Sequence, residues 1–247
     1  MSDGTTITID AAGGPAEAYL AGDDGAPGLL VYVDGIGLRP QIEEMADRMA
    51  AWGYLVLVPH LFYREGRAGE LAPKRDLRAD GELAAFFASG VMERIGTLTP
   101  EVVAADAEAW IGALLEHAGA GPVGTVGYCV GATFAVRLGG QFGEGVAAVG
   151  GFHGGNLVTG RDDSPHLQIA AAGATYCFGH ADGDQWMPPE AVATLEQTLT
   201  EAGRPHRNEV YEGAQHGYTM ADTSTYDGAA AERHFAALRK LLDETLR

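Results

Sequence analysis

The chain has 247 residues, of which 46% are hydrophobic, and this is enough for one large buried core. Its 16 lysines and arginines are outnumbered by 34 aspartates and glutamates, and a formal net charge of −18 argues against nucleic acid or an anionic membrane as a partner. The sequence predicts neither a signal peptide nor a membrane span, and its two cysteines favour a reducing cytoplasm over a disulfide framework.

Strands and a helix alternate in the first sixty residues. Two short predicted strands are followed by two continuous apolar runs, at 5–9, 16–20, 28–33 and 54–59. Continuous apolar runs are typical of strands that are buried on both faces. Between them, Pro40 begins a predicted helix that Gly53 closes. This strand-helix-strand unit predicts two parallel strands with a right-handed connection.

Residues 60–98 have no clear periodicity and are predicted to be a lid or insert. Five of the 16 basic residues lie between positions 64 and 78 of this acidic chain. One interpretation is a solvated surface loop and helix. The other is an excursion over the site that attracts an anionic substrate.

The alternation resumes at Thr99 and Pro100, which form a typical helix start. The later predicted strands are at 123–128, 146–149, 174–178 and 208–211, and the later helices begin after Cys129, at Pro188 and near Phe235. The whole chain, 1–247, is therefore predicted to be a single α/β domain with a mostly parallel, doubly wound sheet flanked by helices.

A cysteine stands between two glycines at the end of one predicted strand, in Gly127-Tyr128-Cys129-Val130-Gly131. Gly-x-Cys-x-Gly is the thiol version of the nucleophile elbow, a tight strand-to-helix turn whose glycines let strand and helix approach. The first N–H groups of the helix then favour a thiolate at the turn. The structural alternative is a buried, inert cysteine, and this is the interpretation for Cys177 within its apolar strand.

The other candidate catalytic groups also follow strands. They are His216 and an aspartate that is either Asp184 or Asp182. Asp184 is favoured because Pro188 fixes the spacing to the next helix. The order nucleophile, acid, histidine is that of the α/β-hydrolases, so His216 is predicted to take the proton of Cys129 and the aspartate to orient the imidazole.

Two backbone N–H groups are predicted to form an oxyanion hole. One belongs to Val130, the residue after the nucleophile. The other comes from the loop after the third strand, from Gly35 or Ile36.

These motifs resemble the dienelactone hydrolases, cysteine-dependent members of the α/β-hydrolase fold. The resemblance rests on the cysteine elbow, on Gly213-Ala214-Gln215-His216-Gly217-Tyr218, on Asp184 followed by Pro188, and on Asp34-Gly35-Ile36-Gly37. It implies hydrolysis of a small ester, lactone or enol-lactone through a thiol acyl-enzyme, without metal or organic cofactor. It also implies that Asp34, one methylene shorter than the family's glutamate, contacts the resting cysteine.

The resemblance also bears on the substrate. The family binds the substrate carboxylate with arginines, one of them four residues after the catalytic histidine, where this chain has Met220. Arg75 or Arg78 is the candidate for the other arginine. Further candidates for the substrate pocket are Tyr128, His153 and Tyr218.

Two other function classes remain open from the sequence. A catalytically silent ligand-binding protein on the same fold is one, although all three triad residue types are present. A metal-dependent enzyme that uses His60, His153 and His180 after their strands is the other, although their spacing matches no zinc motif.

Overall fold

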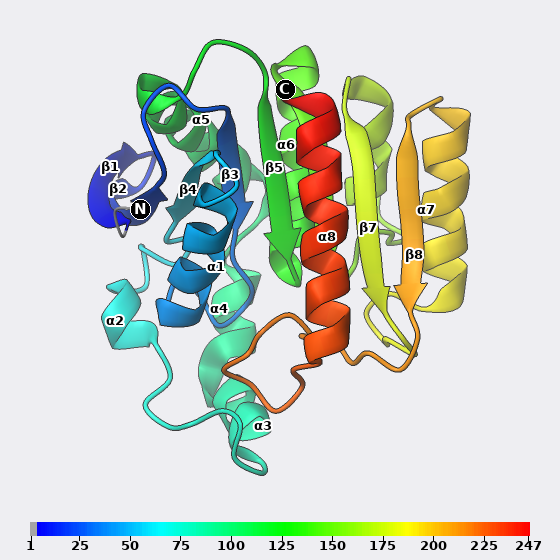
Figure 1. Ribbon diagram of the computed structural model, residues 1–247. Coiled ribbons are helices and arrows are strands. Elements are labelled where there is room, and N and C mark those ends of the chain that lie inside the picture. The colour runs from blue at the N-terminus through cyan, green and yellow to red at the C-terminus, as the bar shows by residue number, and fades with distance from the viewer. Residues whose placement is uncertain (1–3) are drawn as a thin grey trace.

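A computed structural model describes residues 4–247, and eight of their strands form one sheet in the order β1-β2-β4-β3-β5-β6-β7-β8 (Figure 1). The strands are β1 (Thr5–Ala11), β2 (Gly14–Ala21), β3 (Gly28–Tyr32), β4 (Leu55–Pro59), β5 (Val123–Tyr128), β6 (Val146–Phe152), β7 (Thr175–Ala181) and β8 (His206–Tyr211). Only the pairs β1–β2 and β2–β4 are antiparallel, and the other five pairs are parallel. The predicted fold class, a mostly parallel doubly wound sheet, is confirmed.

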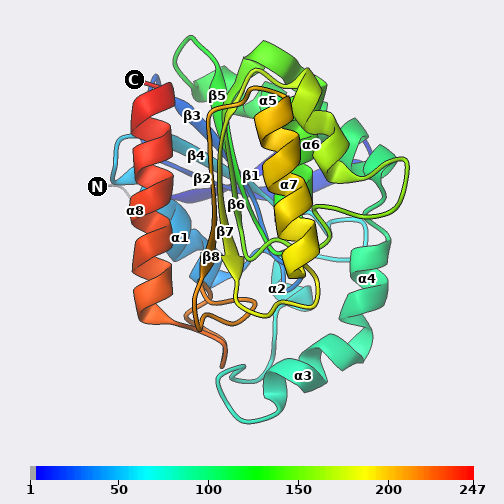
Figure 2. The same cartoon turned by 90° about the vertical axis from the view of Figure 1, so that its right-hand side faces the viewer.

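Helices cover both faces of the sheet (Figure 2). One face carries α1 (Pro40–Ala50) and α8 (Gly228–Thr245), and the other carries α5 (Pro100–His117), α6 (Val130–Phe142) and α7 (Pro189–Glu201). Every residue of β3, β4 and β5 is buried between these layers, as their continuous apolar sequence predicts. No helix among residues 4–247 is both long enough and apolar enough to cross a bilayer.

Some boundaries differ from the prediction. β6 continues through Gly150 and Gly151, beyond the predicted end of the strand. The apolar pattern weakens at these glycines because close packing leaves little room for a side chain. A Cβ at Gly150 would lie 3.1 Å from Cγ2 of Val126. The last helix begins at Gly228, well before Phe235, because the Asp227 carboxylate caps it by accepting the Ala229 and Ala230 N–H groups at 2.9 and 3.0 Å.

Residues 60–98 form a separate group of short elements. They comprise α2 (Ala68–Leu71), α3 (Glu82–Phe86), a π-helical turn (Phe87–Val91) and α4 (Met92–Gly96). Outside this segment, two 3₁₀ turns occur at Gly143–Gly145 and Pro165–Ala171. The chain kinks at Gly90, which has a φ of 100°. Both views show α3 and α4 beyond the ends at which the parallel strands point (Figures 1 and 2). The insert therefore lies at the carboxyl edge, where α/β sheets form their sites.

Candidate active site

Cys129 occupies the sharp turn between the end of β5 and the start of α6. Its φ is 54° and its ψ is −121°, a conformation that costs a non-glycine residue roughly 1–3 kcal/mol. A Cβ at Gly127 would lie 2.1 Å from the Gly131 carbonyl oxygen, and a Cβ at Gly131 would lie 2.4 Å from that of Tyr32. Both glycines of the motif are therefore required by the close approach of β5, α6 and β3.

Gly131→Ala is expected to destabilise the fold by about 1–3 kcal/mol, because backbone rather than a flexible side chain blocks the added methyl group. The matched control is Gly112→Ala in α5, where an added Cβ would meet no heavy atom within 4 Å. The control is expected to gain roughly 0.5–1 kcal/mol from helix propensity. Thermal denaturation of both variants measures the difference, and equal midpoints would contradict the packing described for the elbow.

The N-terminus of α6 and the loop after β3 supply the candidate oxyanion donors. The N–H of Val130 opens α6. In the loop, the N–H of Ile36 donates to Oδ1 of Asp34 at 3.0 Å. The N–H of Gly35 makes no hydrogen bond to any residue in 4–247. Of the two predicted loop donors, Gly35 is therefore the one whose N–H is available to a ligand.

Asp34 is held by a buried arginine. Its Oδ1 and Oδ2 accept hydrogen bonds from the two terminal nitrogens of Arg39 at 2.8 and 3.1 Å, and Arg39 also contacts Asp222 at 2.6 Å. Burial opposes the charge of Arg39, but the two carboxylates outweigh it and raise its pKa. Within residues 4–247, Asp34 makes no hydrogen bond to Cys129. The acidic group expected to restrain the resting cysteine is instead engaged by Arg39.

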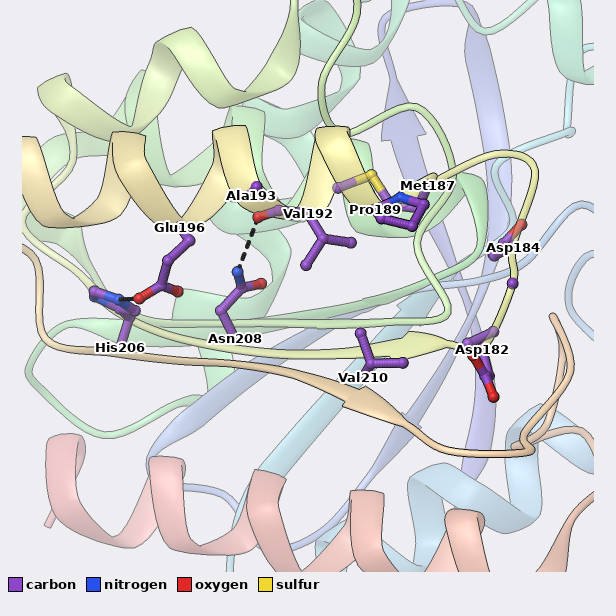
Figure 3. Close-up of a pocket in the computed structure, with 12 residues that line it drawn as sticks. Asp182, Asp184, Met187, Pro189, Val192, Ala193, Glu196, His206, Asn208 and Val210 are labelled. Carbon is purple, nitrogen blue, oxygen red and sulfur yellow. Dashed lines mark hydrogen bonds and ion pairs between the residues drawn. The ribbon is translucent and has the colours of Figure 1, made fainter.

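His216 is paired with Asp184. The distance from its Nδ1 to Oδ2 of Asp184 is 2.6 Å, and Oδ1 of Asp184 accepts the Trp186 N–H at 2.9 Å. Asp182 instead accepts the Gly213 N–H at 2.9 Å. Figure 3 shows both aspartates at one end of a cavity of about 490 Å³ between β8 and α7, with Asp182 beside Val210 and Asp184 farther along the turn. The structure thus brings Asp184, rather than Asp182, to the histidine.

The environment of His216 favours its protonated form. Burial opposes the charge, but the negative charge of a Cys129 thiolate and the hydrogen bond to Asp184 outweigh burial and raise the pKa of His216 to about 10. Its neighbour His153 lies with the ring centroids 5.3 Å apart, and burial and the nearby positive charge lower the pKa of His153. The site therefore favours an imidazolium at position 216 beside a neutral imidazole.

Cys129 and His216 open onto the same cavity, whose volume is about 830 Å³. The insert and the helix start that follows it line one side, with Leu83, Phe87, Met92, Ile95, Gly96, Leu98, Thr99, Pro100 and Glu101. The other side is formed by Val130, Thr133, Phe134, Arg137, Gly155, Asn156, Thr159, Arg161, Asp163, Pro165 and Trp186. Residues 60–98 thus build a wall of the cavity that holds the cysteine.

None of the five predicted substrate-pocket residues lines this cavity. Tyr128 is fully buried, and its hydroxyl oxygen lies 3.0 Å from Nε2 of His234 in α8. It therefore points to the face of the sheet that α8 covers, and not into the cavity. Tyr218 donates to the Gly179 carbonyl at 2.9 Å. His153 lies behind His216, with its Nε2 2.7 Å from Oγ1 of Thr219.

The two arginines also lie away from the cavity. Arg75 pairs with Glu82 and Arg78 with Asp76, both at 2.8 Å and both largely exposed. Met220, at the position of a family arginine, is buried in the core. The insert therefore contributes to the cavity through its apolar side chains and not through the basic residues that the sequence singles out.

The three strand-end histidines do not converge. The Nε2 atom of His60 lies 2.9 Å from the Gly66 carbonyl, and that of His180 lies 2.6 Å from Oδ1 of Asn208, while His153 contacts Thr219. Within residues 4–247, no group of three His, Cys, Asp or Glu side chains is arranged to hold a metal ion.

The chain is similar in sequence and in fold to proteins of one family. The family model for the dienelactone hydrolase family matches residues 16–246. A Synechocystis protein provisionally named carboxymethylenebutenolidase is 24% identical over 227 residues, which cover 90% of this chain and 87% of that protein. The hydrolase tropI of Talaromyces stipitatus is 27% identical over 196 residues, which cover 77% of this chain and 70% of that protein. A provisionally assigned dienelactone hydrolase structure from Klebsiella pneumoniae superposes with a TM-score of 0.81 at 19% identity, over 98% of both chains.

Proposed function

The chain belongs to the dienelactone hydrolase family and is a carboxylic ester hydrolase with the α/β-hydrolase fold, and from this premise we propose that Cys129 is its nucleophile. The observation that carries the proposal is the position of His216. Its Nδ1 lies 2.6 Å from Oδ2 of Asp184, and its side chain lines the same cavity as Cys129 at the N-terminus of α6. The substrate is a small ester, lactone or enol-lactone.

The first half of the reaction forms an acyl-enzyme. The Cys129 thiolate attacks the carbonyl carbon, and the N–H groups of Val130 and Gly35 stabilise the resulting oxyanion. When the intermediate collapses, the carbon–oxygen bond of the ester breaks and Nε2 of His216 gives its proton to the leaving alkoxide. In a lactone the new hydroxyl stays attached to the acyl group. The product of this half is a thioester on Cys129.

The second half regenerates the thiolate. Neutral His216 takes a proton from water while the water oxygen attacks the thioester carbon. Collapse of this second intermediate breaks the carbon–sulfur bond and releases the carboxylic acid. Asp184 binds Nδ1 throughout, so it fixes the tautomer and leaves Nε2 to give and take the proton. All steps use groups of this chain and one water molecule.

The cytoplasm is the proposed location. Both Cys129 and Cys177 are free thiols. A reducing compartment keeps a thiol nucleophile in the form that this reaction needs.

Asp184→Asn tests the arrangement of the triad. Loss of the carboxylate is expected to lower kcat/KM for p-nitrophenyl acetate by about 100-fold, because the imidazolium loses its partner and its orientation. The effect is smaller than in a serine enzyme because a thiol ionises more readily than a hydroxyl. Asp182→Asn is the matched control, because the Asp182 carboxylate accepts the Gly213 N–H and makes no hydrogen bond to His216 within residues 4–247. The control is expected to stay within a few-fold of the unaltered protein, and the reverse ranking would make Asp182 the triad acid.

A further inference from the structure

The wall of the active-site cavity is apolar and partly open to solvent. The insert presents Leu83, Phe87 and Met92 to it, and Trp186 lies on the other side. Met92 and Trp186 are 46% and 39% exposed, so two large apolar side chains face water at this one cavity. Exposed apolar surface that adjoins a nucleophile is typical of a binding site for an apolar group.

Acidic and basic side chains occur in equal number on the cavity wall. Its two acidic residues, Glu101 and Asp163, balance its two basic residues, Arg137 and Arg161. Arg161 contacts the Asp163 carboxylate at 2.8 Å, and Arg137 donates to the Asp163 carbonyl oxygen at 2.5 Å. A substrate carboxylate near Arg161 would compete with the Asp163 carboxylate, and one near Arg137 would be repelled by Asp163 and Glu101.

The arginines outside the cavity are engaged as well. Arg39 is held between Asp34 and Asp222, with its side chain only 3% exposed. Arg94 donates from its terminal nitrogen to the Gly35 and Ile36 carbonyl oxygens at 3.2 and 3.3 Å. Neither arginine lines the cavity. The residues around Cys129 thus offer an apolar surface and a neutral ionic cluster.

We infer that the preferred substrate is an uncharged ester or lactone with an extended apolar group, which lies against the insert and covers Met92. This inference rests on the proposed function and specifies its substrate class. The cavity of about 830 Å³ falls in the upper part of the range for sites that enclose drug-sized molecules, and is far larger than a simple lactone needs. A carboxylate at the far end of the substrate is disfavoured because the apolar wall would remove its hydration, while Asp163 and Glu101 already offset the charges of Arg161 and Arg137.

Three p-nitrophenyl esters test the inference directly. The acetate is the reference, the hexanoate adds four methylene groups, and the adipate monoester keeps that chain length but ends in a carboxylate. Burial of the added methylenes is expected to raise kcat/KM by roughly 10–100-fold from acetate to hexanoate. The adipate monoester is expected to fall well below the hexanoate.

The possible outcomes separate this inference from the proposed function. Cys129-dependent turnover of the acetate with no gain for the hexanoate, or with a preference for the adipate monoester, would overturn the inference alone. Absence of Cys129-dependent turnover with all three esters would overturn the proposed function and the inference with it.

Met92→Ser locates the apolar group. The substitution is expected to reduce the hexanoate-to-acetate ratio of kcat/KM by about 5-fold, because the chain loses its contact with the insert. Leu115→Ser is the matched control, since Leu115 is 49% exposed on α5 and lies outside the cavity. The control should keep the ratio of the unaltered protein. An unchanged ratio in Met92→Ser would contradict the placement of the apolar group against the insert.

Discussion

Cys129→Ala is expected to lower kcat/KM for p-nitrophenyl acetate by about 10⁴-fold or more, because the acyl-enzyme can no longer form. The thermal midpoint should stay within a few degrees, since Cys129 is only partly buried and contributes little to packing. Steady-state kinetics and thermal denaturation of the same preparation measure both effects. Cys129→Ser is measured beside it, because it keeps the shape of the side chain and replaces the thiol by a hydroxyl that ionises far less readily, and it is expected to lose most of the activity.

Cys177→Ala is the matched control for this experiment. Cys177 lies within β7 and is 2% exposed, and burial raises the pKa of its thiol to about 11. Its removal is expected to cost stability through a small cavity while leaving most of the activity. If Cys129→Ala retained turnover while Cys177→Ala lost it, the assignment of the nucleophile would be wrong.

Arg39→Leu is expected to destabilise the fold by about 3–5 kcal/mol, because it leaves the buried Asp34 carboxylate without its partner. Arg39 joins Asp34 to Asp222, which are far apart in the sequence, and the side chains of Arg39 and Asp34 are 3% and 6% exposed. Denaturant unfolding measures the loss. The double variant Arg39→Leu/Asp34→Asn should recover part of it, since the unpaired charge is then absent.

Arg48→Leu provides the comparison for a surface pair. Arg48 contacts Glu232 at 2.6 Å, but the two side chains are 39% and 63% exposed. An exposed ion pair contributes about 0–1 kcal/mol, so this substitution should change the free energy of unfolding little. Equal losses in Arg39→Leu and Arg48→Leu would contradict the structural importance of the buried pair.

The sequence predicts the fold and the position of the cysteine well, for local reasons. The apolar runs of β3 and β4 are short and uninterrupted, which identifies strands covered on both faces. The elbow is readable because Gly127 and Gly131 sit where only glycine avoids the backbone of α6 and β3. Both signals depend on neighbouring residues and on simple geometry.

The choice between the two aspartates could not be made so firmly. Asp182 and Asp184 both follow β7, and the turn decides which carboxylate reaches His216. Asp184 is fixed by the Trp186 N–H, a contact that depends on the folded turn. The link that Arg39 makes between Asp34 and Asp222 is still harder to predict, since no local pattern joins a loop after β3 to a loop before α8. A signal was nevertheless present in Arg39, which follows Asp34 closely enough to reach it.

The cavity wall illustrates a second limit. Basic residues of the insert draw attention in an acidic chain, yet Arg75 and Arg78 make local pairs with Glu82 and Asp76. The insert residues that reach the cavity are apolar, and two of them, Phe87 and Met92, lie on either side of the kink at Gly90. Their direction follows from that kink and from packing across the site, which a search for periodicity cannot detect. Trp186 likewise owes its position to the turn that carries Asp184.

The most direct test of the central claim is the identification of the acyl-enzyme. The protein is mixed with p-nitrophenyl acetate, quenched with acid during the burst, and analysed by intact mass and peptide mapping. We expect one acetyl group on the peptide that contains Cys129, its loss with time as p-nitrophenol release continues, and its absence from Cys129→Ala. Sustained turnover without an acetyl group on Cys129, or with the label on another residue, would contradict a thiol acyl-enzyme at this site.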